Sequence, residues 1–64
     1  MSIGENIKSR RNAMGMSQSE LASAIGVSAP MICQIERGTK SPTLRLSVDI
    51  ARVLKCDLND LVRE

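Results

Sequence analysis

The segment QSELASAIGVSAPMICQI, residues 18–35, contains the pattern of two short helices joined by a tight turn. A helix-turn-helix needs a small residue where its helices cross, and Ala22 supplies one. It also needs a residue that tolerates positive φ in the turn, and Gly26 does so without steric cost. Apolar anchors at helical spacing flank the turn: Leu21, Ile25, Val27, Ile32 and Ile35. The combination predicts a helix-turn-helix over residues 17–37.

Cap and break residues extend the helical prediction to the rest of the chain. Ser17 is an N-cap residue, and Glu20 three positions later completes a capping box. Pro30 falls in the first turn of the next helix, where its missing N–H is not needed. The predicted helices begin near residues 3, 17, 28, 43 and 57, and Gly15, Gly26 and Gly38 end the first three. Because no stretch alternates with the period of a strand, we predict an all-α fold: residues 1–64 as one compact five-helix bundle.

Composition and charge limit the classes of partner. The 64 residues suffice for one small globular domain, and none is aromatic. Single-stranded nucleic acid usually stacks on aromatic side chains, so double-stranded nucleic acid is the better candidate for a partner. The net charge is +2, and residues 1–47 carry Lys8, Arg10, Arg11, Arg37, Lys40 and Arg45 against Glu5, Glu20 and Glu36. This excess fits a face that meets phosphates, and it fits equally a mixed solvated surface.

Other classes of function find little support in the residues. With no His in the chain, Cys33 and Cys56 cannot complete a four-ligand zinc site, and we interpret both as reduced thiols. The first residues lack the apolar run of a secretory signal, and no run is long enough to cross a membrane. Nor is there a nucleophile–base pair or a phosphate-binding glycine loop. We therefore expect a cytoplasmic protein that is not an enzyme and has no cofactor, metal or small-molecule ligand.

Over nearly its whole length the chain resembles the Cro/repressor-type (XRE) helix-turn-helix family, which has the lambda-repressor-like fold. The most specific elements are Ser17-Gln18-Ser19-Glu20-Leu21-Ala22 and Ile35-Glu36-Arg37-Gly38 at this separation. The resemblance implies that the second helix lies across the DNA backbone and the third enters the major groove. It also implies a transcriptional repressor that binds a palindromic operator as a homodimer.

The resemblance extends to individual site residues. The outward face of the third helix supplies the expected base contacts: Ala29, Pro30, Cys33 and Gln34. A Gln amide can bond bidentately to adenine, whereas Ala and Pro at this position leave thymine methyls or DNA shape as the signal. The expected phosphate contacts are Gln18, Ser28, Arg37, Thr39 and Lys40. Capping alone explains Ser28 equally well, and ordinary exposed polarity is the alternative for Gln18, Gln34 and Lys40.

Two further features of the resemblance concern architecture. Arg11 and Glu36 match a pair that in the family forms a salt bridge between the first helix and the end of the third. The order Leu46-Ser47 departs from the family's polar-then-apolar order and leaves Leu46 and Val53 on one helix face. Either the fourth helix is rotated and still buries Leu46, or residues 43–63 form a dimer seam of Leu46, Val53, Leu58, Leu61 and Val62. An antitoxin-like protein-interaction module with secondary DNA binding is the alternative function.

Overall fold

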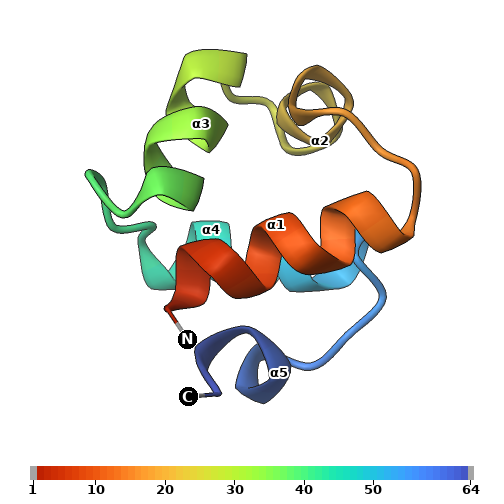
Figure 1. The fold of residues 1–64 in the computed structure, drawn as a ribbon, viewed down its shortest axis with the longest axis vertical. Helices are drawn as coiled ribbons and strands as arrows, with labels where there is room; N and C mark the ends of the chain where they lie inside the picture. Colours follow the sequence, from red (N-terminus) through yellow and green to blue (C-terminus); the bar gives the residue numbers. More distant parts are fainter. Residues whose placement is uncertain (1, 64) are drawn as a thin grey trace.

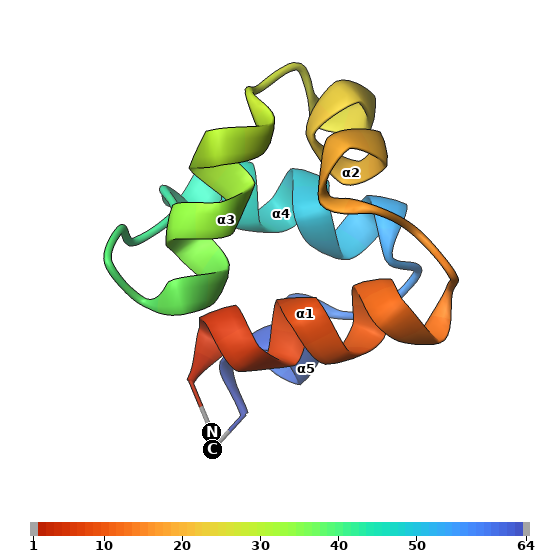
Figure 2. The same ribbon diagram turned by 45° about the horizontal axis from the view of Figure 1, so that its top comes forward.

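The computed structural model describes residues 2–63, which form five α-helices and no β-strand (Figure 1). The helices are α1 (Ile3–Ala13), α2 (Gln18–Ile25), α3 (Ala29–Arg37), α4 (Leu44–Val53) and α5 (Leu58–Val62). In both views α2 and α3 lie at one end of the molecule and α5 at the other (Figures 1 and 2). The predicted all-α, five-helix fold is confirmed. No helix within residues 2–63 is both long and apolar enough to cross a membrane.

Side-chain caps set where the helices begin. The hydroxyl of Ser17 accepts from the Glu20 N–H at 3.0 Å, and the Ser17 N–H donates to the Glu20 carboxylate at 2.8 Å. The hydroxyls of Ser28 and Thr43 accept from the N–H groups of Met31 and Leu46 at the starts of α3 and α4, so these three predicted helix starts are confirmed. The structure adds a capping box at the start of α1, where Ser2 caps the helix and Glu5 reaches back to it.

The core is aliphatic and draws on every helix. Six side chains are fully buried: Ile7 of α1, Leu21 of α2, Ile32 and Ile35 of α3, Ile50 of α4 and Leu61 of α5. Where α2 turns into α3, Gly26 has a φ of 74° and the N–H of Val27 donates to the Ala22 carbonyl at 2.9 Å. Ala22 is 2% exposed, so the predicted small residue lies at this helix contact.

The predicted dimer seam needs a correction, because two of its five residues lie in the core of the subunit. Leu46 is 8% exposed and Leu61 is fully buried, so neither presents a surface to a second copy. Helix α4 buries the neighbouring Ser47 as well, and its hydroxyl donates to the Thr43 carbonyl at 2.9 Å. This bond satisfies the buried hydroxyl, which lets α4 turn Leu46 inward. Of the others, Val53 and Leu58 are half-buried and Val62 is exposed.

A buried amide joins the two ends of the chain. The Nδ2 atom of Asn6 in α1 donates to the carbonyl oxygens of Leu61 and Arg63, each at 2.8 Å. Helix α5 has only five residues and is too short to be stable alone. The Asn6 bonds satisfy carbonyls that the end of this helix leaves free, and they hold α5 against α1.

Replacement of Lys55 by Gly is expected to stabilise the fold by about 0.5–1 kcal/mol. Lys55 follows α4 with a φ of 58°, a left-handed conformation that costs a residue with a Cβ about 1–2 kcal/mol. The greater freedom of Gly in the unfolded chain offsets part of the gain. Urea unfolding of Lys55→Gly and Lys55→Ala separates the causes: only the Gly variant should gain stability. An equal gain in both would mean that the side chain, not the backbone, is unfavourable.

Candidate nucleic-acid interface

The outward face of α3 is anchored by the buried side chains on its other face. Ile32 and Ile35 point into the core, which leaves Pro30, Gln34 and Arg37 exposed to solvent. Of the remaining predicted base contacts, Cys33 is half-buried, and Ala29 is half-buried and packs against the core. Among the four predicted base contacts, Gln34 is therefore the one with an exposed polar side chain.

The N-terminal ends of α2 and α3 are each capped by a serine hydroxyl. The first N–H groups of a helix have no acceptor within it, and the helix dipole makes this end attractive to anions. Ser28 accepts from the Met31 N–H at 3.3 Å, which leaves its hydroxyl proton free to donate. Both helix starts therefore have the polarity that a phosphate group requires.

The loop after α3 is folded back onto the end of that helix. Gly38 ends the helix with a φ of 82°, and the N–H groups of Thr39 and Lys40 donate to the Gln34 carbonyl at 3.0 and 3.3 Å. The Thr39 hydroxyl donates to the same carbonyl at 3.1 Å, so its proton is already used. Lys40 is exposed and carries the positive charge of this loop.

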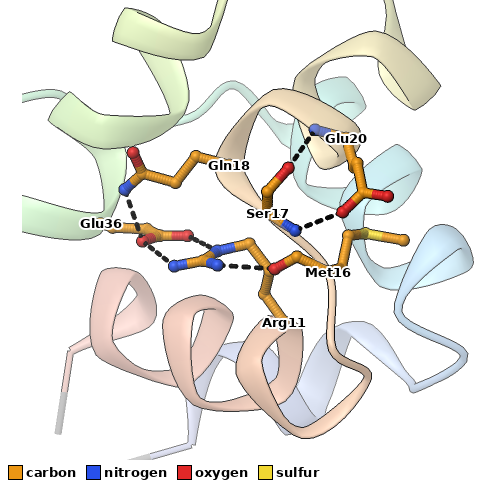
Figure 3. Close-up of polar contacts among 6 residues, drawn as sticks. All are labelled: Arg11, Met16, Ser17, Gln18, Glu20 and Glu36. Atoms are coloured by element: carbon orange, nitrogen blue, oxygen red, sulfur yellow. Dashed lines mark hydrogen bonds and ion pairs between the residues drawn. The ribbon is translucent and has the colours of Figure 1, made fainter.

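A buried ion pair connects α1, α2 and α3 behind the exposed face (Figure 3). Two nitrogens of Arg11 donate to the two carboxylate oxygens of Glu36, Nε at 2.7 Å and Nη2 at 3.0 Å. The remaining nitrogen, Nη1, donates to the Met16 carbonyl at 2.7 Å, and Nε2 of Gln18 donates to Glu36 at 3.0 Å. The Arg11 and Glu36 side chains are 9% and 2% exposed. The structure thus brings the two predicted salt-bridge partners together, with every buried polar side-chain atom of residues 2–63 hydrogen-bonded.

Opposing effects act on the pKa of Glu36. Burial raises it, whereas hydrogen bonds from Arg11 and Gln18, with the charges of Arg11 and Lys8, lower it more strongly. The net pKa lies below the ordinary value for Glu. The pKa of Arg11 is raised, chiefly by its hydrogen bonds to Glu36. The pair is therefore ionised at neutral pH.

The structure shows a contact of Gln18 that was not predicted from the sequence. Sequence reasoning assigned Gln18 to a phosphate and did not connect it with Glu36. One N–H of its amide binds Glu36, and the second N–H is not needed for that bond. No local pattern marks this contact, because the two residues lie 18 positions apart and meet only when α2 and α3 cross.

These features define a helix-turn-helix DNA-binding domain, with α2 and α3 as the two helices. The Helix-turn-helix family profile matches residues 7–61. An HTH-type transcriptional regulator of Archaeoglobus fulgidus is 42% identical over 55 residues, 86% of this chain and 79% of that protein. The chain belongs to the Cro/repressor-type (XRE) family of helix-turn-helix transcriptional regulators.

The solved structures include a repressor of the same fold. The P22 c2 repressor in complex with a synthetic operator matches with a TM-score of 0.93 and 28% identity, over 98% of this chain and 96% of that one. Relatives differ in length. The chain spans only 29% of the regulator y4dL of Sinorhizobium fredii, to which it is 41% identical over 56 residues, 88% of this chain.

Proposed function

We propose that this protein is a sequence-specific double-stranded DNA-binding repressor that acts as a homodimer on a palindromic operator. The observation that carries the proposal is the exposed face of α3. Helix α3 presents Gln34 to solvent, and the opposite side of the helix is held by Ile32, Ile35 and the Arg11–Glu36 pair. A base-reading helix has to be held rigidly, because hydrogen bonds to base edges depend on its position. The similarity to a repressor solved with its operator supports the same function.

Phosphate contacts and base contacts have separate residues in this proposal. Gln18, Ser28, Arg37 and Lys40 contact phosphates and fix the register of α3, without reading sequence. Thr39 contributes through its place in the loop, since its hydroxyl proton stays on α3. Gln34 reads a base, Pro30 and Cys33 contact the groove beside it, and the half-buried Ala29 adds the smallest contact.

Selection of bound duplexes from a random DNA pool tests the proposal. We expect an inverted repeat with half-site centres about 10 base pairs apart, the spacing of one helical turn. Gln34→Ala should lose the preference at one position of each half-site, worth about 1–3 kcal/mol, and keep it elsewhere. A folded protein that enriches no sequence would reject the proposal and favour the protein-interaction alternative, which co-purification of a stoichiometric partner would identify.

Lys40→Ala is expected to weaken binding to all duplexes by a similar factor and to reduce the salt dependence. Each phosphate contact releases about one counterion, so the slope of log affinity against log salt should become shallower by about one. Titrations at several salt concentrations with operator and scrambled duplex measure both effects. Arg63→Ala, an exposed cation near the C-terminus, is the matched control and should leave the slope unchanged. A loss of affinity for the operator duplex alone, with unchanged affinity for the scrambled duplex, would assign Lys40 to base reading instead.

A further inference from the structure

Lys8 belongs to α1, outside the helix-turn-helix, on the side of that helix next to the end of α3. In both views the first turns of α1 run beside the last turn of α3 (Figures 1 and 2). The approach is close, because a Cβ at Gly4 would lie 2.8 Å from the Glu36 carbonyl oxygen. Lys8 and Arg11 follow Gly4 by four and seven residues, so the three share one side of the helix. Since Gly4 and Arg11 both contact Glu36, Lys8 between them lies near the same end of α3.

The carboxyl of Glu36 also reports that the charge of Lys8 is close. Burial raises the pKa of Glu36, and the hydrogen bonds from Arg11 and Gln18 lower it. The charges of Arg11 and Lys8 lower it further, as opposite charges do when they lie near a carboxyl. The Glu36 carboxylate nevertheless has Arg11 as its counter-charge and takes its three hydrogen bonds from Arg11 and Gln18. The positive charge of Lys8 is therefore near α3 without being paired to Glu36.

No other anion of the described chain neutralises Lys8. Its side chain is exposed and belongs to no ion pair among residues 2–63. The acidic residue of α1, Glu5, accepts from the Ser2 N–H at 2.9 Å at the start of the helix. Arg37 and Lys40, the two exposed cations at the end of α3, are likewise outside the ion pairs of this region. Positive charges gathered in this way attract an anion to the surface between them.

We propose that Lys8 binds a phosphate of the DNA backbone, so that the interface extends from the helix-turn-helix onto α1. The inference rests on the proposed function, because it requires α3 to lie on DNA. A lysine ammonium is a point charge on a flexible stem, which suits a phosphate beside the groove. The contact adds affinity for every duplex and no sequence preference, because it involves the backbone alone.

Removal of the charge tests the contact through the salt dependence. Lys8→Met should weaken binding to operator and scrambled duplex by a similar factor, about tenfold at about 0.1 M salt and less as the salt rises. The slope of log affinity against log salt should become shallower by about one, and by about two in the double variant with Lys40→Ala. Lys8→Arg keeps the charge and should keep the slope. Lys55→Met removes an exposed lysine between α4 and α5 and is the matched control, which should bind as wild type.

Replacement of single DNA phosphates by uncharged methylphosphonates identifies the phosphate that Lys8 binds. At that position the substitution should weaken wild type about tenfold and leave the affinity of Lys8→Met nearly unchanged. At every other contacted position the two proteins should lose affinity by equal factors, because the effects of independent changes are additive. Lys40→Ala should be insensitive at a different position, since the double variant is expected to lose two phosphate contacts.

A purely structural role for Lys8 gives a different result. A cation near the C-terminal end of a helix stabilises that helix through its dipole. In that case Lys8→Met would unfold at lower urea concentration, keep the wild-type salt slope and be coupled to no phosphate, which would overturn the proposal. If only Lys40→Ala makes the slope shallower, DNA binding stands and the interface does not reach Lys8. If wild type binds no duplex, the DNA-binding proposal fails and the Lys8 contact fails with it.

Discussion

Glu36→Gln is expected to lower the free energy of unfolding by about 3 kcal/mol, a large share of what so small a domain has. The carboxylate accepts three hydrogen bonds, two from Arg11 and one from Gln18. A carboxamide keeps the shape but turns an NH₂ group toward one set of donors. It also leaves the Arg11 guanidinium, whose side chain is 9% exposed, without a counter-charge. The cost is that of a buried charge without its partner, which exceeds the net value of the pair itself.

Urea unfolding of two single variants and one double variant separates the cost of a buried charge without a partner from the net contribution of the ion pair. Arg11→Met and Glu36→Leu should each be strongly destabilising, while the double variant should lose clearly less than the sum. Removing both members of a buried pair leaves no lone charge behind, so the coupling is expected to be about 1–3 kcal/mol. Additive losses would mean that Arg11 acts through its bond to the Met16 carbonyl and hardly through Glu36.

The Arg11–Glu36 pair also makes the difference in unfolding free energy between wild type and Glu36→Gln depend on pH. The pKa of Glu36 is lower in the folded protein than its ordinary value, so ionisation of this carboxyl favours folding. That stabilisation is fully present above the unfolded pKa of about 4.3. It is lost as the pH falls below this value and through the folded pKa, so the two proteins should become closer in stability in acid. A difference that stays constant down to acid pH would show that the carboxylate charge is not responsible.

The parts of the fold that could be predicted from the sequence are those that depend on residues a few positions apart. Ser17 with Glu20, Ser28 and Thr43 fixed three helix starts, because a capping hydroxyl and the backbone N–H that donates to it lie within one turn. The small residue at the helix crossing was predictable too, since Ala22 stands at a fixed offset from Gly26. These features act within a few residues, so one sequence contains all the information they need.

The parts that could not be predicted depend on contacts between distant residues. Asn6 binds the carbonyls of Leu61 and Arg63, and nothing near Asn6 indicates an acceptor more than 50 positions away. Leu46 and Leu61 fit an exposed seam and a buried core equally well by spacing. Their placement was decided by the rotation of α4 and by the way α5 packs on α1.

The candidate site shows the same division. Gln34 and Arg37 could be placed outward because Ile32 and Ile35 fix the inner face of their own helix. Resemblance to the family predicted the Arg11–Glu36 pair. The hydrogen bond from Gln18 to Glu36, in contrast, depends on how α2 crosses α3. Which bases these residues would contact in the proposed complex depends on the DNA sequence as well as on this chain.

Gly4→Ala is expected to destabilise the fold by about 3 kcal/mol, although helix propensity argues for the opposite sign. Gly4 lies in the first turn of α1, where Ala is intrinsically better by up to about 1 kcal/mol. A Cβ at this position would, however, collide with the carbonyl oxygen of Ile35 and lie 2.8 Å from that of Glu36. Both are backbone atoms at the end of α3 and cannot rotate away. Helices α1 and α3 must separate, which strains the packing of Ile7 and the geometry of the Arg11–Glu36 pair.

Urea unfolding of Gly4→Ala beside Gly26→Ala distinguishes this collision from the ordinary cost of losing a glycine. Gly26 has a φ of 74° and nothing within 4 Å of its added Cβ, so its variant should lose only the backbone term of about 1–2 kcal/mol. Gly4→Ala should lose more and should also weaken DNA binding, because α1 holds α3, the proposed recognition helix, through the Arg11–Glu36 pair. If Gly4→Ala were as stable as wild type, α1 and α3 would have to lie farther apart than this fold places them, and the absence of a side chain at position 4 would have no role in positioning α3.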